Sequence, residues 1–135
     1  MKIQSLTETH AKKVFIKNFI NFPKQLYKTC DKWVPWFDID MKQILTKKHP
    51  FFLHSNGEFF LAEREGKTIG RICVVSNVNY QKQHTRNCAH FFFLDAIEDI
   101  EVFKELFNAV GSWSRQQGQT ILDGPLLFGG TCGSG

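Results

Sequence analysis

The segment from Cys88 to Leu122 constrains the fold more than any other part of the sequence. Cys88–Asp95 is a nearly continuous apolar run, which is typical of a strand covered on both faces. An amphipathic helical pattern follows it, and Thr120–Leu122 then forms a second, shorter apolar run. A strand, a helix and a second strand in this order form a crossover, so the two strands pair in parallel. We therefore predict an α/β fold with these two runs as parallel neighbours.

The helix of this unit is expected between Asp99 and Gly118. Asp99 is a typical N-cap residue, and Gly118 is well placed as the C-terminal stop. Gly111 lies inside the helix at a cost of about 1 kcal/mol relative to Ala. The apolar residues recur at helical spacing and indicate a helix that covers one face of a sheet; they are Val102, Phe103, Leu106, Phe107, Val110 and Trp113.

Residues 58–78 predict an antiparallel hairpin. Glu58–Arg64 and Thr68–Val78 are rich in aromatic and β-branched residues, and Glu65-Gly66-Lys67 between them is a tight-turn sequence. The segment that follows, Asn79–Asn87, is polar throughout and is expected to be an exposed loop. Together with the parallel crossover, the hairpin predicts a mixed central sheet with helices on both faces.

The N-terminal part predicts a short strand followed by two helices. Lys2–Leu6 is the expected strand, Thr7 is the expected N-cap of the first helix, and Pro23 is expected to end or kink that helix. Pro35 can open a second helix that stops at Lys47–Pro50. The apolar positions that define the two helices are Ala11, Val14, Phe15, Phe19 and Phe22, and then Phe37, Met41, Ile44 and Leu45.

Length and composition agree with one globular domain. The chain has 135 residues, of which 42% are apolar and 22% are charged, so disordered and fibrous classes are excluded. We assign residues 1–128 to a single domain and residues 129–135 to a flexible glycine-rich tail. The longest apolar run, Phe91–Leu94, is far shorter than the roughly 18 residues of a membrane span.

The four cysteines and the chain start indicate a cytoplasmic protein. Cys30, Cys73, Cys88 and Cys132 form no C-x-x-C pair, and we interpret them as reduced thiols. The first residues contain no apolar signal segment. No metal site is expected either, because no third ligand is suitably spaced from His49 and His54. We therefore expect no metal and no membrane contact.

Charge is distributed unevenly along the chain. Residues 1–50 hold ten Lys and four acidic residues, a net charge of +6, whereas residues 51–135 carry a net charge of −2. Such asymmetry can indicate an anionic partner. However, most of the lysines are spread singly and no Arg precedes Arg64, whereas proteins that bind nucleic acid usually cluster basic residues. We interpret the lysines as a solvated helical face and expect no nucleic acid as partner.

The hairpin and several short motifs resemble the GNAT superfamily of N-acetyltransferases. Within Phe59–Ile72 the chain has Ala62-x-x-x-Gly66-Lys67-x-x-Gly70, a pattern similar to the hairpin of that superfamily. Over residues 3–128 the chain resembles the N-terminal portion of a bacterial GNAT-like branch. The motifs that carry this are Phe22-Pro23-x-x-Leu26-Tyr27, Trp33-Val34-Pro35, His49-Pro50-Phe51-Phe52-x-His54 and Asp123-Gly124-Pro125.

This resemblance implies a cofactor strand and an acceptor pocket. In GNAT enzymes the fourth strand and the helix after it hold acetyl-CoA, which implies backbone contacts to the cofactor at Phe93, Leu94 and Asp95. The region of the first two helices walls the acceptor pocket, and there Tyr27, Trp33 and Trp36 are the expected substrate-binding residues. The same aromatic residues also suit a small core that holds two helices on the sheet. No residue is assigned a catalytic role.

The pyrophosphate loop of the superfamily is missing from this sequence. The loop normally supplies glycines and a basic or amide side chain at a helix N-terminus, where free amides bind phosphate. The equivalent stretch, Leu94–Glu101, has no Gly and no Arg, and it carries four acidic residues. Two hypotheses remain open. The chain is either an acyltransferase that moves an acyl group from acyl-CoA to an amine, or a non-catalytic GNAT-like module for binding or assembly.

The sheet is expected to be incomplete at the C-terminus. The GNAT fold continues with a further helix and strands, so the edge at Thr120–Leu122 would recruit a partner strand. We expect either a homodimer or completion by missing C-terminal residues, and a small molecule as ligand.

Three further residues suit a general base. Glu58 and Glu63 lie on the hairpin, where we interpret them as surface residues. His90 lies in the apolar strand, where we interpret it as a neutral core or edge histidine.

Overall fold

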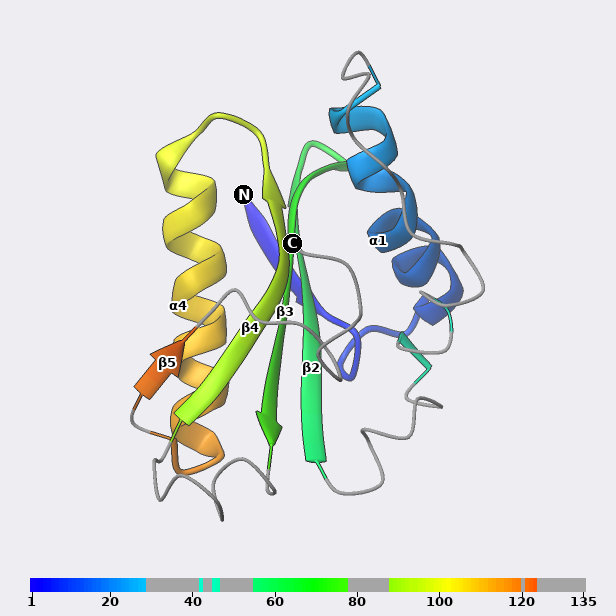
Figure 1. Ribbon diagram of the computed structural model, residues 1–135. Helices are drawn as coiled ribbons and strands as arrows, with labels where there is room; N and C mark the ends of the chain where they lie inside the picture. Colours follow the sequence, from blue (N-terminus) through cyan, green and yellow to red (C-terminus); the bar gives the residue numbers. More distant parts are fainter. Residues whose placement is uncertain (29–41, 43–44, 47–54, 78–87, 120, 124–135) are drawn as a thin grey trace.

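The computed structural model describes residues 1–28, 42, 45–46, 55–77, 88–119 and 121–123. Within them, five strands form one sheet in the order β1-β2-β3-β4-β5, and two helices flank it (Figure 1). The strands are β1 (Lys2–Ser5), β2 (Ser55–Arg64), β3 (Lys67–Asn77), β4 (Cys88–Ala96) and β5 (Ile121–Asp123). The helices are α1 (Lys12–Leu26) and α4 (Ile100–Gln116).

The sheet is mixed, as the sequence predicts. β1 to β4 pair antiparallel in succession, whereas β4 and β5 pair in parallel. The parallel partners are Cys88 with Ile121, Ala89 with Leu122 and His90 with Asp123. α4 connects these two strands, so the expected strand–helix–strand crossover is confirmed.

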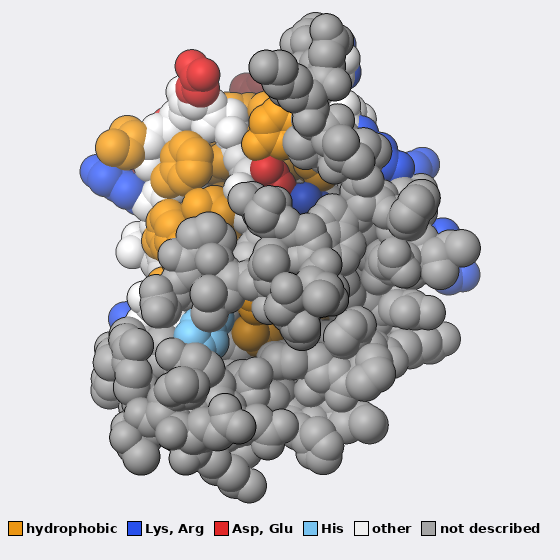
Figure 2. All heavy atoms as spheres, viewed as in Figure 1, with side chains coloured by type: hydrophobic (Ala, Val, Ile, Leu, Met, Phe, Trp, Pro, Cys, Tyr) orange, Lys and Arg blue, Asp and Glu red, His pale blue; other side chains and the backbone are white. Residues whose placement is uncertain are grey.

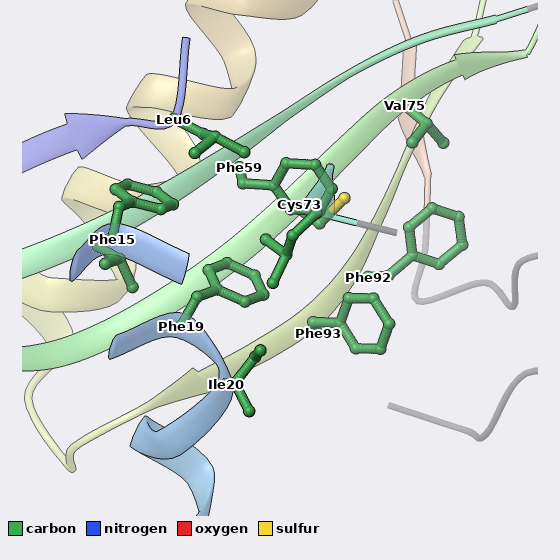
Figure 3. Close-up of a cluster of buried hydrophobic side chains, with 11 residues drawn as sticks. Leu6, Phe15, Phe19, Ile20, Phe59, Cys73, Val75, Phe92 and Phe93 are labelled. Atoms are coloured by element: carbon green, nitrogen blue, oxygen red, sulfur yellow. The ribbon is translucent and has the colours of Figure 1, made fainter. Parts of the chain in front are cut away.

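α1 covers one face of the sheet and α4 covers the other (Figure 1). On the α1 face, Phe19 is fully buried and meets Phe59 edge-on, with 5.5 Å between ring centroids. Figure 3 shows this α1-side cluster, in which α1 side chains meet those of β2, β3 and β4. Its members include Leu6, Phe15, Phe19, Ile20, Phe59, Cys73, Val75, Phe92 and Phe93. Phe and aliphatic burial of this kind supplies most of the stability of a small domain.

On the α4 face, three residues spaced by one helical turn are fully buried: Val102, Leu106 and Val110. They pack in one cluster with β2 and β3 side chains. α4 also comes very close to the β3 backbone. A Cβ added at Gly70 would lie 2.9 Å from Val102 Cγ1 and 3.0 Å from Leu106 Cδ1. The glycine therefore sets the distance between helix and sheet.

Three local predictions are confirmed. The hairpin turn has positive φ at both Glu65 (53°) and Gly66 (77°), the combination that matches the twist of paired strands. Asp99 caps α4, because its side chain accepts a hydrogen bond from the backbone N–H of Glu101. Past the end of α4, Gly118 adopts a φ of +79°, which glycine tolerates without strain.

The start of α1 differs from the prediction. α1 begins at Lys12, and its N-cap residue is Ala11, which makes no side-chain cap hydrogen bond. Thr7 lies instead in the turn after β1, where its N–H donates to a Glu58 carboxylate oxygen at 3.3 Å. The Lys12 ammonium binds the carbonyls of Leu6 and Thr7 at 2.7 and 3.2 Å. Tertiary contacts to β2 therefore decide where the turn ends and the helix begins.

Pro23 does not end α1. The helix continues to Leu26, and the N–H of Tyr27 donates to the Pro23 carbonyl at 2.9 Å. Pro23 is itself buried, beside the buried Phe22. Packing of this segment against the rest of the protein offsets the one hydrogen-bond donor that proline removes.

The second predicted helix falls mostly outside the described residues. Of it, Leu45 is described as a fully buried member of the α1-side cluster, and Lys42 and Thr46 are exposed. The polar loop at 79–87, Trp33, Trp36, and the motifs at 49–54 and 124–125 also lie outside the described residues.

Candidate functional site

A β-bulge interrupts β4 at the position where the resemblance places the cofactor. In the register with β3, Phe92 lies opposite Cys73 and Asp95 lies opposite Arg71. Phe93 and Leu94 of β4 therefore face a single residue of β3. Phe93 has a φ of 54°, which a non-glycine residue adopts only under constraint. The bulge puts Phe92 and Phe93 on the same face, since both belong to the α1-side cluster.

The bulge lies on the part of β4 that extends past β5. The parallel pairing with the described part of β5 ends at His90, and β4 continues for six residues to Ala96. In Figure 1 this end of β4 rises beside the start of α4. The irregular backbone thus falls at the predicted cofactor residues, Phe93 to Asp95, which follow the described pairing with β5.

Asp95 joins Arg71 and Tyr27 in one network beneath α1. Arg71 Nε donates to Asp95 Oδ2 at 2.9 Å, and the Tyr27 hydroxyl donates to Asp95 Oδ1 at 2.7 Å. A second guanidinium nitrogen of Arg71 donates to the Phe19 carbonyl at 2.7 Å. The Arg71–Asp95–Tyr27 network therefore ties the C-terminal part of α1 to β3 and β4.

The network is largely shielded from water. The side chains of Arg71 and Asp95 are 7% and 15% exposed. The Arg71 guanidinium carbon lies 4.9 Å from the ring centroid of Phe19 and 5.5 Å from that of Phe93. Burial lowers the pKa of Arg71 below its ordinary value, and the Asp95 carboxylate opposes this shift. Both carboxylate oxygens of Asp95 are used in holding its neighbours, so its side chain is a structural group.

The structure therefore brings together two residues that the sequence assigned to different roles. Tyr27 was expected on the acceptor side and Asp95 on the cofactor strand, and they share a hydrogen bond. Arg71 was missed by the sequence analysis. The signal for it was present, because Arg71 alternates with Cys73 and Val75 on the buried face of a strand. A charged residue in that position requires a buried partner.

The start of α4 holds a carboxylate where the superfamily holds a pyrophosphate. Asp99 Oδ1 accepts from the Glu101 N–H at 3.0 Å, and Arg64 donates to Asp99 Oδ2 at 3.1 Å. The hydrogen bond from Arg64, together with that from Glu101, lowers the pKa of Asp99. Because Asp99 already caps the helix and Glu98 and Glu101 flank it, these residues do not fit a pyrophosphate.

A cavity of about 460 Å³ lies beside α1. Ile16 and Ile20 contribute apolar surface, and three ammonium groups line it, from Lys13, Lys17 and Lys42. Figure 2 shows Lys and Arg side chains along the edge of the molecule where α1 lies. The N-terminal excess of positive charge is thus partly gathered around this cavity, which favours an anionic group over an amine.

The remaining candidates differ in burial. His90 is 3% exposed on β4, which confirms a core position. Glu63 is partly buried and accepts a hydrogen bond from the Gln4 amide at 3.0 Å, whereas Glu58 is only 6% exposed, so its assignment to the surface is wrong. Among the described residues, no three His, Cys, Asp or Glu side chains form a metal-ligand group. No helix in the same set is long and apolar enough to span a membrane.

Solved acetyltransferases share this fold. No family model matches the chain. A tandem GNAT protein from the clavulanic acid biosynthesis pathway superposes with a TM-score of 0.68 at 11% identity, over 90% of this chain and 35% of that one. Aminoglycoside N-acetyltransferase AAC(6')-Iy in complex with CoA gives a TM-score of 0.61 at 17% identity, over 96% and 82% of the two chains.

A third solved structure, a predicted acetyltransferase with acetyl-CoA from Clostridium acetobutylicum, gives a TM-score of 0.63 at 9% identity, over 96% of this chain and 83% of that one. The chain therefore has the fold of the GNAT superfamily, as the motifs indicated.

Two curated bacterial proteins are similar in sequence. Protein YghO of Escherichia coli (strain K12) is 32% identical over 123 residues, which are 91% of this chain and 32% of that protein. A bacterial ceramide synthase of Caulobacter vibrioides is 34% identical over 113 residues, 82% of this chain and 29% of that protein. The chain thus spans about a third of the length of the curated relatives it matches.

Proposed function

We propose that this chain belongs to an N-acyltransferase of GNAT type, which transfers an acyl group from a thioester to an amine. In that reaction the amine nitrogen bonds to the acyl carbon, the carbon–sulfur bond breaks, and the departing thiolate sulfur takes up the proton that the amine nitrogen loses. The observation that carries the proposal is the β4 bulge at Phe93, on the part of β4 that extends past β5. Its coincidence with a GNAT fold supports a ligand-binding role for this strand.

The acyl donor is proposed to bind along the backbone of Phe93, Leu94 and Asp95. Acetyl-CoA is the proposed form of the donor, with its thioester end at the bulge. The acidic start of α4 does not suit a pyrophosphate, so the nucleotide end is proposed to contribute little to binding. The acceptor is proposed to approach on the α1 side, near Tyr27, with Trp33 and Trp36 as further contacts.

The chemistry of one relative agrees with an amine acceptor. A ceramide is an N-acylated long-chain amino alcohol, so a ceramide synthase forms an amide bond. We propose the same bond type here and leave the acceptor otherwise unspecified. The three lysines around the α1 cavity repel an ammonium group, so the acceptor amine is not placed in that cavity.

One observation favours a second candidate function. The α4 N-terminus is closed by the Asp99 cap and the Arg64–Asp99 ion pair, and a GNAT enzyme needs this position for its cofactor. A GNAT-like module that binds or assembles without CoA would have this arrangement. The two candidates make opposite predictions for the binding of acyl thioesters.

Calorimetry with two ligands separates the candidates. The protein is titrated with acetyl-CoA and, separately, with S-acetylpantetheine, which lacks the pyrophosphate and nucleotide. The acyltransferase proposal predicts that both bind, with affinities within about tenfold, since the missing contact is worth less than about 1.4 kcal/mol. Binding of neither ligand at millimolar concentration would overturn the proposal and leave the non-catalytic module.

A pair of substitutions at Phe93 tests the bulge itself. Phe93→Gly and Phe93→Val both remove the ring, but only glycine keeps the positive φ without strain. If the bulge holds the thioester, the glycine variant retains ligand binding and the valine variant loses it. Circular dichroism and thermal melting confirm that both variants fold. Equal binding by the two folded variants would show that the bulge is not the contact.

We also propose that the sheet edge at β5 pairs with another strand. β5 is the last strand in the order of the described sheet, and an unpaired strand edge recruits partners. A homodimer is the proposed state of this chain by itself. Light scattering after size-exclusion chromatography is expected to give twice the monomer mass, and a monodisperse monomer would contradict the proposal.

A further inference from the structure

A cavity of about 430 Å³ lies on the α4 face of the sheet, opposite the face that Phe92 and Phe93 share with α1. Its walls come from the turn after β1, the start of β2 and the C-terminal half of α4. In Figure 1 α4 lies on one side of the sheet and α1 on the other. Its size is in the range of small-molecule sites.

Glu58 gives this cavity a buried negative charge. Its alternation with Phe60 along β2 directs it to the α4 face, and it is 6% exposed. Two backbone N–H groups, those of Phe59 and Thr7, donate to the same oxygen, Oε1, at 2.9 and 3.3 Å. No described residue donates to Oε2, and this oxygen is not among the fully buried atoms without a partner, so it reaches the open space of the cavity. A carboxylate this buried is costly unless a positive or hydrogen-bonding partner meets its second oxygen.

The surroundings of Glu58 favour a cation as that partner. The last turn of α4, with Gln116 and Gln117, brings the negative end of the helix dipole to the cavity. Trp113 lines the cavity, and an indole face attracts ammonium groups. Glu8 adds a second carboxylate to the lining.

The nearby protein cations have other partners. Lys12 binds the carbonyls of Leu6 and Thr7, and a guanidinium nitrogen of Arg115 lies 3.3 Å from Ser112 Oγ. Neither Lys12 nor Arg115 lines the cavity. Among the described residues no cation meets Glu58 Oε2, which leaves this oxygen open to a cation from outside.

The rest of the lining is rich in hydroxyl and amide groups. Asn56 Nδ2 donates to Gln117 Oε1 at 3.3 Å, so this contact connects β2 to α4 at the edge of the cavity. Hydroxyl groups of Ser5, Thr7 and Ser112 supply further donors and acceptors. Such groups suit a ligand with several hydroxyls. We propose that this cavity binds a small hydroxylated primary amine, with its ammonium group on Glu58 and its body against Trp113.

Binding is tested with two amines and their neutral counterparts. Glucosamine and serinol are titrated into the protein, and glucose and glycerol are the matched neutral ligands. Two-dimensional NMR follows the Trp113 indole N–H and the backbone amides of Gly57 and Ser112. At least one amine is expected to shift these signals at millimolar concentration and to bind about tenfold or more tightly than its neutral counterpart, as a charged hydrogen bond provides.

A matched pair of variants tests whether the Glu58 carboxylate binds the ammonium group of the ligand. Glu58→Gln keeps an acceptor for the Thr7 and Phe59 N–H groups and removes the charge, so it is expected to fold. It should weaken amine binding about tenfold or more. Glu63→Gln, on the same strand but outside the cavity, should leave amine binding unchanged.

Three outcomes would overturn the proposal. The first is that neither amine shifts the Trp113, Gly57 and Ser112 signals. The second is that each amine binds no more tightly than its neutral counterpart. The third is that Glu58→Gln and Glu63→Gln change amine binding equally. The proposed acyl transfer stands apart from these outcomes, because Phe93 of the β4 bulge belongs to the α1-side cluster, whereas the cavity lies on the α4 face of the sheet.

Discussion

Removal of the Asp95 carboxylate is expected to be among the most destabilising single changes in this protein. Asp95→Ala leaves the Arg71 guanidinium, whose side chain is 7% exposed, with the Phe19 carbonyl and two aromatic rings as its partners among the described residues. It also removes the hydrogen bond from the Tyr27 hydroxyl to Asp95 Oδ1. Breaking a buried ion pair on one side costs about 3–5 kcal/mol, because the remaining charge is buried without its partner. We expect a loss in this range.

Two further variants separate the contribution of the Tyr27 hydrogen bond from that of the Arg71–Asp95 ion pair. Tyr27→Phe removes one hydrogen bond to a charged group and should cost about 1.5–3 kcal/mol. Arg71→Met removes the charge but keeps an unbranched apolar chain between Phe19 and Phe93. Combined with Asp95→Leu, it replaces the ion pair by apolar groups, an exchange that is often neutral or stabilising. The double variant Arg71→Met/Asp95→Leu is therefore expected to be more stable than Asp95→Ala.

Urea unfolding followed by circular dichroism measures these differences. The free energy of unfolding is obtained from the midpoint and the slope of each transition, and the slope must stay constant for the comparison to hold. A double-mutant cycle on Arg71 and Asp95 isolates their coupling. The exposed pair of Arg64 and Asp99 is the matched control, and water and salt should screen it to a much weaker coupling. The reasoning is refuted if Asp95→Ala costs less than about 1 kcal/mol, well below the range for a buried pair.

Three further predictions follow from local geometry. Gly70→Ala should destabilise the fold by about 1–3 kcal/mol, because the added methyl group overpacks against Val102. Gly111→Ala should stabilise α4 by about 0.5–1 kcal/mol, because the added methyl group meets the end of the flexible Arg115 side chain. Thermal melting measures both changes, and the opposite signs would contradict the packing described. Asp99, whose pKa the hydrogen bond from Arg64 lowers, contributes stability above its unfolded pKa that is lost as pH falls through its folded pKa. Melting temperatures of the wild type and Asp99→Asn should therefore converge in strong acid, and a constant difference down to the lowest pH would rule this out.

Local sequence signals were sufficient for most of the sheet. The Glu65-Gly66 turn, the Asp99 cap and the Gly118 stop act within a few residues of themselves, so their effects were predictable without any tertiary information. The apolar run at Cys88–Asp95 and the amphipathic α4 then required a parallel partner, which β5 supplies. Where distant contacts competed with local preference, prediction failed. Thr7 contacts Glu58 and does not cap α1. The helix also continues past Pro23, which is buried.

The candidate sites depended more strongly on tertiary structure. The sequence selected Phe93, Leu94 and Asp95 through a family resemblance, but it gave no sign of the bulge, which is a mismatch in register between two strands. It also placed Glu58 at the surface, since burial of a strand residue depends on which helix covers its face.

The sequence by itself determined the hairpin, the parallel crossover and the extent of α4, because periodicity, caps and turn residues are properties of short segments. Only the tertiary structure decided which charges meet. Arg71 and Asp95 are 24 residues apart and Tyr27 and Asp95 are 68 apart, and their contact exists only after β3, β4 and α1 have packed together. Burial then gives those charges their energetic weight, since an ion pair matters most where water no longer screens it.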